Sequence, residues 1–399
     1  MIPPLALGAL ASVHELILQL AETLPARDFN RRFEPGLPSA AWLVGRAVYL
    51  ELALLRGEVM GDDDLAGRVQ EIFEQDEPDD AAVDAQLPPQ EHLLGWAGEI
   101  FDQHLTWLAN PGMLPPHPLL DEGLLVWHMA QRLGLIYERL LAVMNARSAA
   151  RDRGEHRVES VLEPRTPGDD SVRVEQGHYR IGAREGVTLP NEQPPQVIEL
   201  HAFRIGRRPA SNAEYLAFVA DGGYRDRAWW DQAGRDWLAD TGAQGPWHWR
   251  QDAAGNWYGI GTNGPLDLHP EDLASGLSAH EARAYAAWAA ARGQGLSGAV
   301  PQHEYQWEIA ARLGMLELTG RVWEWCANPF RPYPGYQVPQ PALLEPCPMD
   351  DDSVALRGGC LHTQPSLRRT TLRHCAAPGR RDRFTGVRLV MPPGPAAWE

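Results

Sequence analysis

The chain has 399 residues, of which 36 are basic and 53 acidic, so its formal net charge is -17. This balance argues against non-specific binding to nucleic acid, because a phosphate-binding face needs a surplus of Lys and Arg. With 44% hydrophobic and 22% charged residues, the composition is that of a folded globular chain, and its length is typical of about two domains.

The N-terminal segment is apolar without a basic leader. It runs into Leu16, Leu20 and Leu24 at helical spacing, which predicts a folded helix in place of a signal peptide. No apolar run approaches the roughly 20 residues that span a bilayer, so no membrane partner is expected. Four cysteines without CxxC spacing favour a reducing compartment, and therefore a cytoplasmic location.

Residues 1–148 show apolar positions spaced by three and four residues, which predicts a bundle of four helices. Ser39 follows a proline and suits the N-cap of the second helix. The helical segments expected are residues 5–25, 39–58, 89–109 and 119–147. A polar stretch rich in Pro and Gly follows at 149–172 and is interpreted as a linker or a strap.

From residue 173 to residue 395 the pattern changes to short alternating runs, which predicts strands near 179–182 and 197–200. Helices are expected at about 211–220 and 278–292, with Ser211 or Asn212 as N-cap of the first. The many tryptophans and the scarcity of regular elements indicate a loop-rich domain held by aromatic packing. The predicted fold class is therefore α+β, a four-helix bundle followed by a mixed domain.

The C-terminal half also carries a series of short motifs in a fixed order. They are Pro209–Tyr215, Asp221–Tyr224, Ser278–Trp288, Glu304–Glu308, Gly320–Trp325, Arg331–Tyr336, Leu356–Gly359 and Phe384–Leu389. Over residues 173–391 this series resembles the formylglycine-generating-enzyme (sulfatase-modifying factor) fold, a variant of the C-type lectin fold. The segments Asp-Gly-Gly-Tyr and Pro-Tyr-Pro-Gly-Tyr are similar to the ergothioneine-type sulfoxide synthases, which carry a DinB-like helical bundle before this domain.

The resemblance implies an iron site that this chain has lost in part. The family binds Fe(II) through a Gly-His pair on the second helix and a His-x-x-x-His on the fourth. Here the first position reads Gly45-Arg46, and the second reads His128 to Arg132, so His128 is the one family ligand retained. A guanidinium stays charged and offers no lone pair to a metal. A relocated site that uses His92 or His104 is the alternative.

Other positions that the resemblance marks as functional are also altered. The two copper-binding cysteines of the sulfatase branch correspond to Thr363 and Arg368. The family's proton-donating tyrosine corresponds to Ser353 or a neighbour, and an Asn near a calcium site of some relatives corresponds to Arg321. The aromatic and acidic residues that hold a trimethylammonium substrate are replaced by residues 390–392, which weakens the case for a betaine substrate.

Arg46 and Arg132 allow two interpretations. They could form buried ion pairs with Glu51, Glu99 or Glu138, or they could line an anion pocket beside His128, because the planar guanidinium binds carboxylate and phosphate in a bidentate way.

Two functions from different classes follow from these residues. The substituted triad favours a divergent relative that binds a small anionic or amino-acid-like molecule in a cleft between the domains, with altered catalysis or none. The alternative is a non-heme iron sulfoxide synthase that forms a carbon–sulfur bond on a histidine-derived substrate with Fe(II) and oxygen. Arg46, His128 and Arg132 are the candidate ligand-binding residues, and they are expected to face the C-terminal domain.

Overall fold

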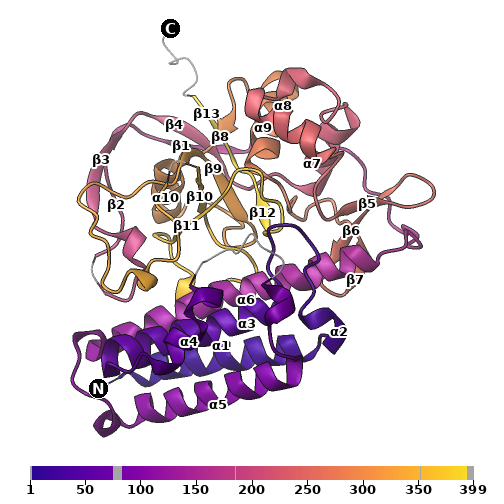
Figure 1. Cartoon of the computed structure of the whole chain (residues 1–399). Coiled ribbons are helices and arrows are strands. Elements are labelled where there is room, and N and C mark those ends of the chain that lie inside the picture. The colour runs from indigo at the N-terminus through magenta and orange to yellow at the C-terminus, as the bar shows by residue number, and fades with distance from the viewer. Residues whose placement is uncertain (1, 75–82, 185, 351, 393–399) are drawn as a thin grey trace.

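A computed structural model describes residues 2–74, 83–184, 186–350 and 352–392. It shows a helical bundle below and a mixed domain of helices and short strands above (Figure 1). The predicted α+β class, with helices first and a loop-rich mixed domain second, is confirmed. The last three residues of the predicted C-terminal domain, 393–395, lie outside the described residues.

Four long helices build the bundle and correspond to the four predicted segments. They are α1 (Pro4–Glu22), α3 (Ala40–Glu51), α5 (Gln90–Ala109) and α6 (Leu124–Arg151). Two shorter helices were not predicted, α2 (Ala26–Phe29) and α4 (Asp64–Phe73). α3 continues as a π-helix over Leu52–Met60, which widens the turn and ends at Gly61, whose φ of 70° is easily adopted by glycine.

Local chemistry explains where α3 begins and how α1 packs. The Ser39 hydroxyl accepts a hydrogen bond from the Trp42 backbone N–H, which confirms the predicted N-cap. α1 buries a stripe that includes Leu10, Val13 and Ile17 against α5 and α6. In the part of the chain that the structure describes, α1 is also the one helix long and apolar enough to cross a membrane by length and composition.

After α6 the chain forms an irregular strap along the C-terminal domain. The Tyr258 hydroxyl donates to the Asp152 carboxylate over 2.6 Å. The Asp267 carboxylate accepts from the backbone N–H groups of Glu159 and Ser160. These hydrogen bonds attach the strap to the three-stranded sheet that contains Tyr258 and Asp267. Regular structure resumes at Ser171.

The C-terminal domain contains four small sheets and four α-helices among its described residues. One sheet has the order β1 (Ser171–Val174), β4 (Phe203–Gly206), β13 (Leu389–Met391), β8 (Val300–Pro301), and another the order β11 (Arg373–Ala376), β10 (Val354–Arg357), β9 (Trp323–Pro329), β12 (Thr385–Gly386). β2 (Gly177–Ile181) pairs with β3 (Gln196–Leu200), and β5 (Trp249–Gln251), β6 (Trp257–Gly261) and β7 (Gly264–Asp267) form the three-stranded sheet. The helices are α7 (Asn212–Ala220), α8 (Gln232–Thr241), α9 (Ala279–Arg292) and α10 (Glu304–Arg312). The pairing is antiparallel except between β12 and β9.

Capping boxes and buried ion pairs hold this domain together. Ser211 and Ser278 are the N-caps of α7 and α9. The backbone N–H of each serine donates a hydrogen bond to the carboxylate of the glutamate at the third position of the same helix. Three arginine–glutamate pairs are buried between loops and strands: Arg357 with Glu308, Arg373 with Glu304, and Arg388 with Glu324. Such pairs satisfy the many buried polar groups of a loop-rich domain.

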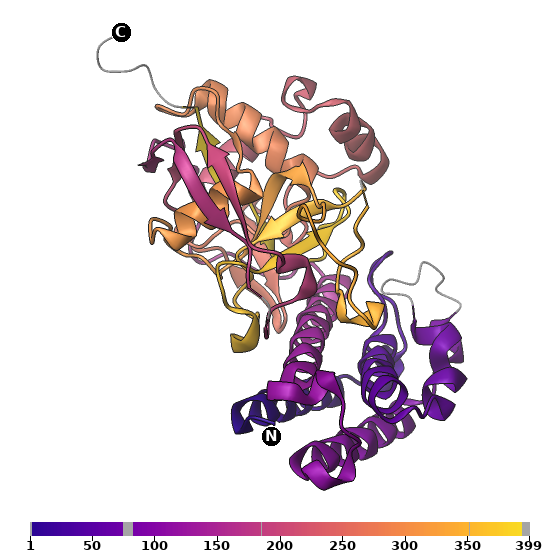
Figure 2. The same cartoon turned by 90° about the vertical axis from the view of Figure 1, so that its left-hand side faces the viewer.

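α6 is the element that joins the two parts (Figures 1 and 2). One face of α6 packs on α1 and α3, while Leu135 belongs to the hydrophobic core of the C-terminal domain. The Trp323 indole N–H donates to the Glu138 carboxylate over 2.8 Å across this interface. Gly134 lets the C-terminal domain approach α6 closely, since a Cβ there would lie 3.2 Å from Gln364.

Candidate functional site

A cavity of about 450 Å³ lies between the bundle and the C-terminal domain, and we call it the interdomain cavity. α3 and α6 form one side, and residues around β11 form the other. The lining residues are Trp42, Leu43, Arg46, Leu50, Arg132, Leu135, Ile136, Arg139, Pro346, Pro348, Ser353, His374, Cys375, Ala376, Ala377 and Arg383. This volume is in the range of small-molecule sites.

Four arginines contribute to the lining: Arg46, Arg132, Arg139 and Arg383. Each of the four arginines also interacts elsewhere in the protein. A guanidinium has five N–H donors, so one arginine can keep a protein partner and still bind an anion.

Arg46 is buried and anchored to the end of α4. Its Nη1 donates to the backbone carbonyl oxygens of Phe73 and Glu74, the second over 2.8 Å. Its guanidinium also lies 5.5 Å from the centroid of the Tyr49 ring. These contacts fix the side chain at the cavity wall.

His374 and Arg383 form the wall opposite the bundle. Arg383 donates to the His374 Nε2 over 2.9 Å, so the ring proton is on Nδ1, which lies 2.9 Å from the Cys347 sulfur. Burial holds the pKa of His374 well below its usual range, and Arg383, Arg139 and Arg132 lower it further. The imidazole is therefore neutral.

His128 is placed differently from the two arginines. Arg46 and Arg132 line the interdomain cavity together, whereas His128 is not among the lining residues. Burial lowers the pKa of His128 to about 4; Arg369 and Arg132 lower it too, and Glu192 opposes them. Of the three candidate ligand-binding residues, Arg46 and Arg132 therefore line the interdomain cavity and His128 does not.

The glutamates considered as ion-pair partners of these arginines have other roles. Glu51 is hydrogen-bonded to His14 and, over 3.0 Å, to His104. Although burial raises the pKa of Glu51, the two imidazoles lower it to about 2. Glu138 accepts from Trp323, and Glu99 is exposed on α5. The Glu51 carboxylate is thus bound by two histidines.

The family resemblance marks positions 46 and 132 as iron ligands, and both carry arginine, whose guanidinium offers no lone pair to a metal. The Arg46 guanidinium is hydrogen-bonded to backbone carbonyl oxygens. The Arg132 guanidinium lines the interdomain cavity. At the alternative positions, His92 is exposed and His104 contacts Glu51. No group of three or more His, Cys, Asp or Glu side chains that could hold a metal ion occurs within the described ranges.

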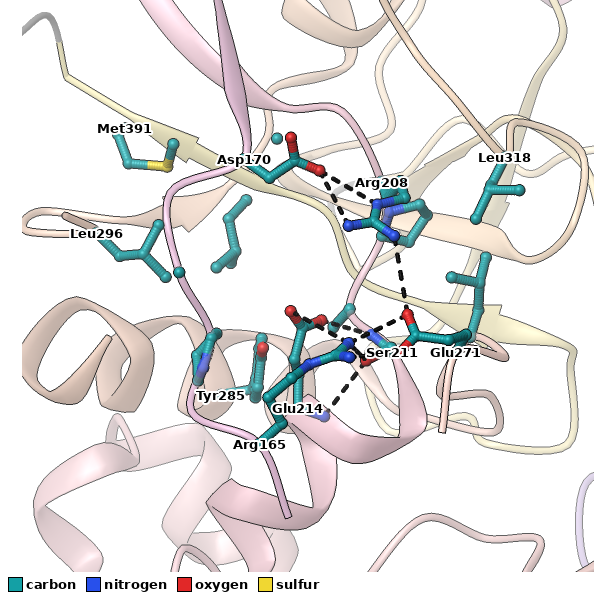
Figure 3. A pocket seen from close by; sticks show the side chains of 17 residues that line it. Arg165, Asp170, Arg208, Ser211, Glu214, Glu271, Tyr285, Leu296, Leu318 and Met391 are labelled. Carbon is teal, nitrogen blue, oxygen red and sulfur yellow. Dashed lines mark hydrogen bonds and ion pairs between the residues drawn. The ribbon is translucent and has the colours of Figure 1, made fainter. Parts of the chain in front are cut away.

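A smaller pocket lies near Arg165 and Arg208 (Figure 3). It is too small to hold a ligand of the size that fits the interdomain cavity. Its volume is about 60 Å³. Its polar side chains are already paired, with Arg208 contacting Asp170 at 3.1 Å and Arg165 donating to the Ser211 hydroxyl at 3.0 Å. The charges across this pocket are therefore structural.

Several lining residues were absent from the sequence prediction. Arg139 follows Arg132 by seven residues, so it lies on the same face of α6, and this periodicity is visible in the sequence. His374 and Arg383 reach the cavity from a different domain. No local sequence pattern connects them to α6.

Comparison with known proteins identifies the C-terminal domain. Residues 158–318 and 312–392 match the family model described as sulfatase-modifying factor enzyme 1-like domain. The chain is 32% identical over 302 residues to a protein named hercynine oxygenase from Mycolicibacterium thermoresistibile, covering 63% of this chain and 65% of the relative. A hercynine oxygenase from Mycobacterium tuberculosis is 30% identical over 247 residues, covering 52% of this chain and 57% of the relative. The structure of PvdO from Pseudomonas aeruginosa is 17% identical with a TM-score of 0.37, and the match covers 60% of this chain and 100% of that chain.

The alignments span less than two thirds of the length of these relatives. The names of the relatives confirm the resemblance to the ergothioneine-type sulfoxide synthases. The matched segments cover residues 158–392, which is more than half of the 399-residue chain. The chain therefore belongs to the sulfatase-modifying factor enzyme 1-like family.

Proposed function

We propose that this protein is a divergent relative of the sulfoxide synthases that binds a small organic or inorganic anion in the interdomain cavity. The observation that carries this proposal is the lining, in which four arginines from α3, α6 and the C-terminal domain converge on one cavity. The ligand class includes phosphate, carboxylates and acidic amino acids, because all of them match the planar fork of a guanidinium.

Three of the arginines suit the recognition of an anion from two sides. Arg132 and Arg139 project from one face of α6, and Arg383 faces them from the C-terminal domain. Leu135, Ile136 and Trp42 supply an apolar wall between the charges. An apolar pocket with a few convergent cationic groups is the usual design of a site for a small charged molecule.

The same substitutions argue for altered catalysis. Two guanidinium groups occupy positions where the family resemblance expects imidazole ligands, and they repel a divalent cation. A single imidazole, His128, is a poor metal site, since affinity comes from several ligands on rigid elements. We therefore infer that the iron triad is lost and that the cavity has been converted to anion binding.

The test is calorimetric titration of the protein with phosphate, citrate and glutamate at low salt. We expect at least one of them to bind and the Arg132→Gln variant to bind it about ten-fold more weakly, because a charge-assisted hydrogen bond is worth about 1.5–3 kcal/mol. The control is Arg68→Gln, which removes the same charge from an exposed position on α4. Equal affinity in Arg132→Gln, or no binding of any of the three anions, would contradict the proposal.

The alternative function is an iron-dependent sulfoxide synthase, and the names of the relatives favour it. Protein loaded with Fe(II) without oxygen and then desalted should retain far less than one iron per chain. Restoring both imidazoles, with Arg46→His and Arg132→His, should raise retention. Stoichiometric iron in the unmodified protein that is lost in His128→Ala would favour the synthase, and retention that depends on His92 or His104 would indicate a relocated site.

We also propose that the protein acts in the cytoplasm on a small molecule and has no nucleic-acid or membrane partner. Its four cysteines are buried and form no disulfide, which fits a reducing compartment. Cell fractionation with activity markers for each compartment tests this location. Recovery in the membrane fraction would contradict it.

A further inference from the structure

Two of the four cysteines, Cys347 and Cys375, lie together beside the interdomain cavity. Cys375 is on β11 and is one of the residues that line the cavity, while Cys347 lies between Pro346 and Pro348, which both line it. Each of the two cysteines is 4% exposed, and both belong to one small hydrophobic cluster. Neither thiol has a role in the proposed anion site.

A series of hydrogen bonds connects the two thiols. The His374 Nδ1, which carries the ring proton, lies 2.9 Å from the Cys347 sulfur. Burial raises the pKa of the Cys347 thiol well above its usual range, and a hydrogen bond with Cys375 raises it further, so Cys347 is the donor in this bond. The Cys375 thiol in turn is directed toward the Pro348 carbonyl oxygen, 4.0 Å away. The two sulfur atoms are therefore direct neighbours.

The other two cysteines are placed differently. Cys326 belongs to the same cluster but lies on β9, and β10 separates it from Cys375 on β11. Two strand spacings amount to about 10 Å, whereas the Cα atoms of a disulfide lie about 4.4–6.8 Å apart. The Cys326 thiol is directed toward the carbonyl oxygen of Glu324 on its own strand. Cys360 packs in the large core of the C-terminal domain, away from this cluster.

The two neighbouring thiols differ in their access to a small oxidant. Cys375 borders a cavity of about 450 Å³, from which a molecule as small as hydrogen peroxide can approach it. Cys347 is not among the lining residues, and burial keeps its thiol protonated. Cys375 is thus the thiol that meets an oxidant first, and Cys347 is placed to react with the product.

We propose that Cys347 and Cys375 are a site of reversible oxidation and form a disulfide when the protein meets a peroxide. In the first step the Cys375 sulfur attacks hydrogen peroxide, the O–O bond breaks, and a sulfenic acid and one water form. In the second step the Cys347 sulfur attacks the Cys375 sulfur, the S–O bond breaks, and the hydroxyl leaves as water with the Cys347 proton. The two thiols lose two electrons and two protons, and one peroxide is reduced to two waters.

The disulfide joins the segment that carries Pro346 and Pro348 to β11, so it crosslinks two parts of the cavity wall. Thiol–disulfide exchange with a reductant returns both thiols. A reducing compartment therefore keeps the pair reduced until peroxide accumulates, which agrees with the proposed cytoplasmic location.

The experiment treats the folded, reduced full chain with hydrogen peroxide, removes the peroxide with catalase, and alkylates the remaining thiols with iodoacetamide under denaturing conditions. Peptide mass spectrometry should find a crosslink between Cys347 and Cys375, with Cys326 and Cys360 alkylated. Dithiothreitol should return all four cysteines to the alkylated fraction. The same treatment in urea should lose the preference for this pair, because the fold brings the two thiols together.

Variants test the order of the two steps. Cys347→Ser removes the second thiol and should leave a sulfenic acid on Cys375 that dimedone traps, whereas Cys375→Ser should leave Cys347 unoxidised. Cys360→Ser is the matched control, a buried cysteine in another core, and should leave the crosslink unchanged.

The mapping of the wild type decides the proposal even where a serine variant does not fold. Four free thiols in the folded protein after peroxide treatment would overturn it, and so would a crosslink between any other pair of cysteines. Oxidation of Cys375 to a sulfinic acid without a crosslink would overturn it as well, because Cys347 would then not be in reach of the sulfenic acid.

Discussion

Arg46 and Arg132 line the same cavity but are held by different parts of the protein. Arg46 donates to the carbonyl oxygens of Phe73 and Glu74 at the C-terminal end of α4, where backbone carbonyls lack helical partners. Its charge also complements the negative end of that helix dipole. Loss of Arg46 would therefore loosen α4, whereas Arg132 is the better single position at which to test ligand binding.

His128 gives a prediction about stability and pH. Its pKa is about 4 in the folded protein and near the ordinary value of 6.5 in the unfolded chain, because burial disfavours the charged ring. Between these values the unfolded chain binds a proton that the folded chain does not. The contribution of His128 to the free energy of unfolding is thus highest above pH 6.5 and falls, by up to about 1.4 kcal/mol per pH unit, as the pH decreases toward 4.

Urea unfolding of the wild type and of His128→Asn between about pH 7.5 and about pH 4.5 measures this contribution. The wild type should lose stability relative to the variant as the pH falls. His178→Asn is the matched control for the substitution, at an exposed histidine. A pH-independent difference for His128→Asn would show that the ring is not buried as a neutral group.

At the scale of elements, the contact between α3 and α4 sets the position of Arg46. Gly45 precedes Arg46, and the Phe73 ring of α4 packs directly over it. A Cβ built on Gly45 would lie 2.2 Å from Phe73 Cζ. The glycine is therefore needed for a close approach of two helices, and this approach brings the end of α4 within reach of the Arg46 guanidinium.

Gly45→Ala should destabilise the protein by about 1–3 kcal/mol, because the added methyl forces the Phe73 ring to move. Gly8→Ala on α1 is the matched control, since a Cβ there meets nothing within 4 Å and alanine is the better helix former. Adding Phe73→Leu to Gly45→Ala should recover part of the loss. Denaturant unfolding measures all three, and equal stability of the two alanine variants would contradict the packing argument.

The long helices were predictable from the sequence and the short ones were not. Apolar spacing sustained over 12 or more residues located α1, α3, α5 and α6. α4 has 10 residues and begins in an acidic stretch whose composition is typical of a loop. α10 has 9 residues and includes the motif Glu304–Glu308, for which the sequence predicted no helix. Short segments acquire helical structure from tertiary packing, which local periodicity does not reveal.

At the scale of the molecule, the candidate sites depend on contacts between distant segments. Arg46 and Arg132 could be singled out because the family resemblance marks their positions. Arg383 and His374 could not, because they enter the cavity from another domain more than 200 residues along the chain.

α6 also predicts how the whole molecule unfolds. It has 28 residues, and its buried positions serve both parts: Leu133 lies in the bundle core and Leu135 in the core of the C-terminal domain. Glu138 accepts the Trp323 indole proton between them, and Gln131 accepts from Arg369 over 2.9 Å. Because one helix completes two cores, neither part should remain stable after the other unfolds.

We therefore expect a single cooperative transition. Far-UV circular dichroism reports mainly the helices, and tryptophan fluorescence reports mainly the C-terminal domain, which holds 10 of the 15 tryptophans between residues 229 and 325. Glu138→Ala leaves the buried Trp323 N–H without its acceptor, which costs about 1–3 kcal/mol and should lower both midpoints by the same amount. Glu138→Gln is the control, since its amide oxygen can still accept from Trp323. Two separate transitions, or a midpoint shift confined to fluorescence, would show that the bundle and the C-terminal domain are stable independently and that α6 does not couple them.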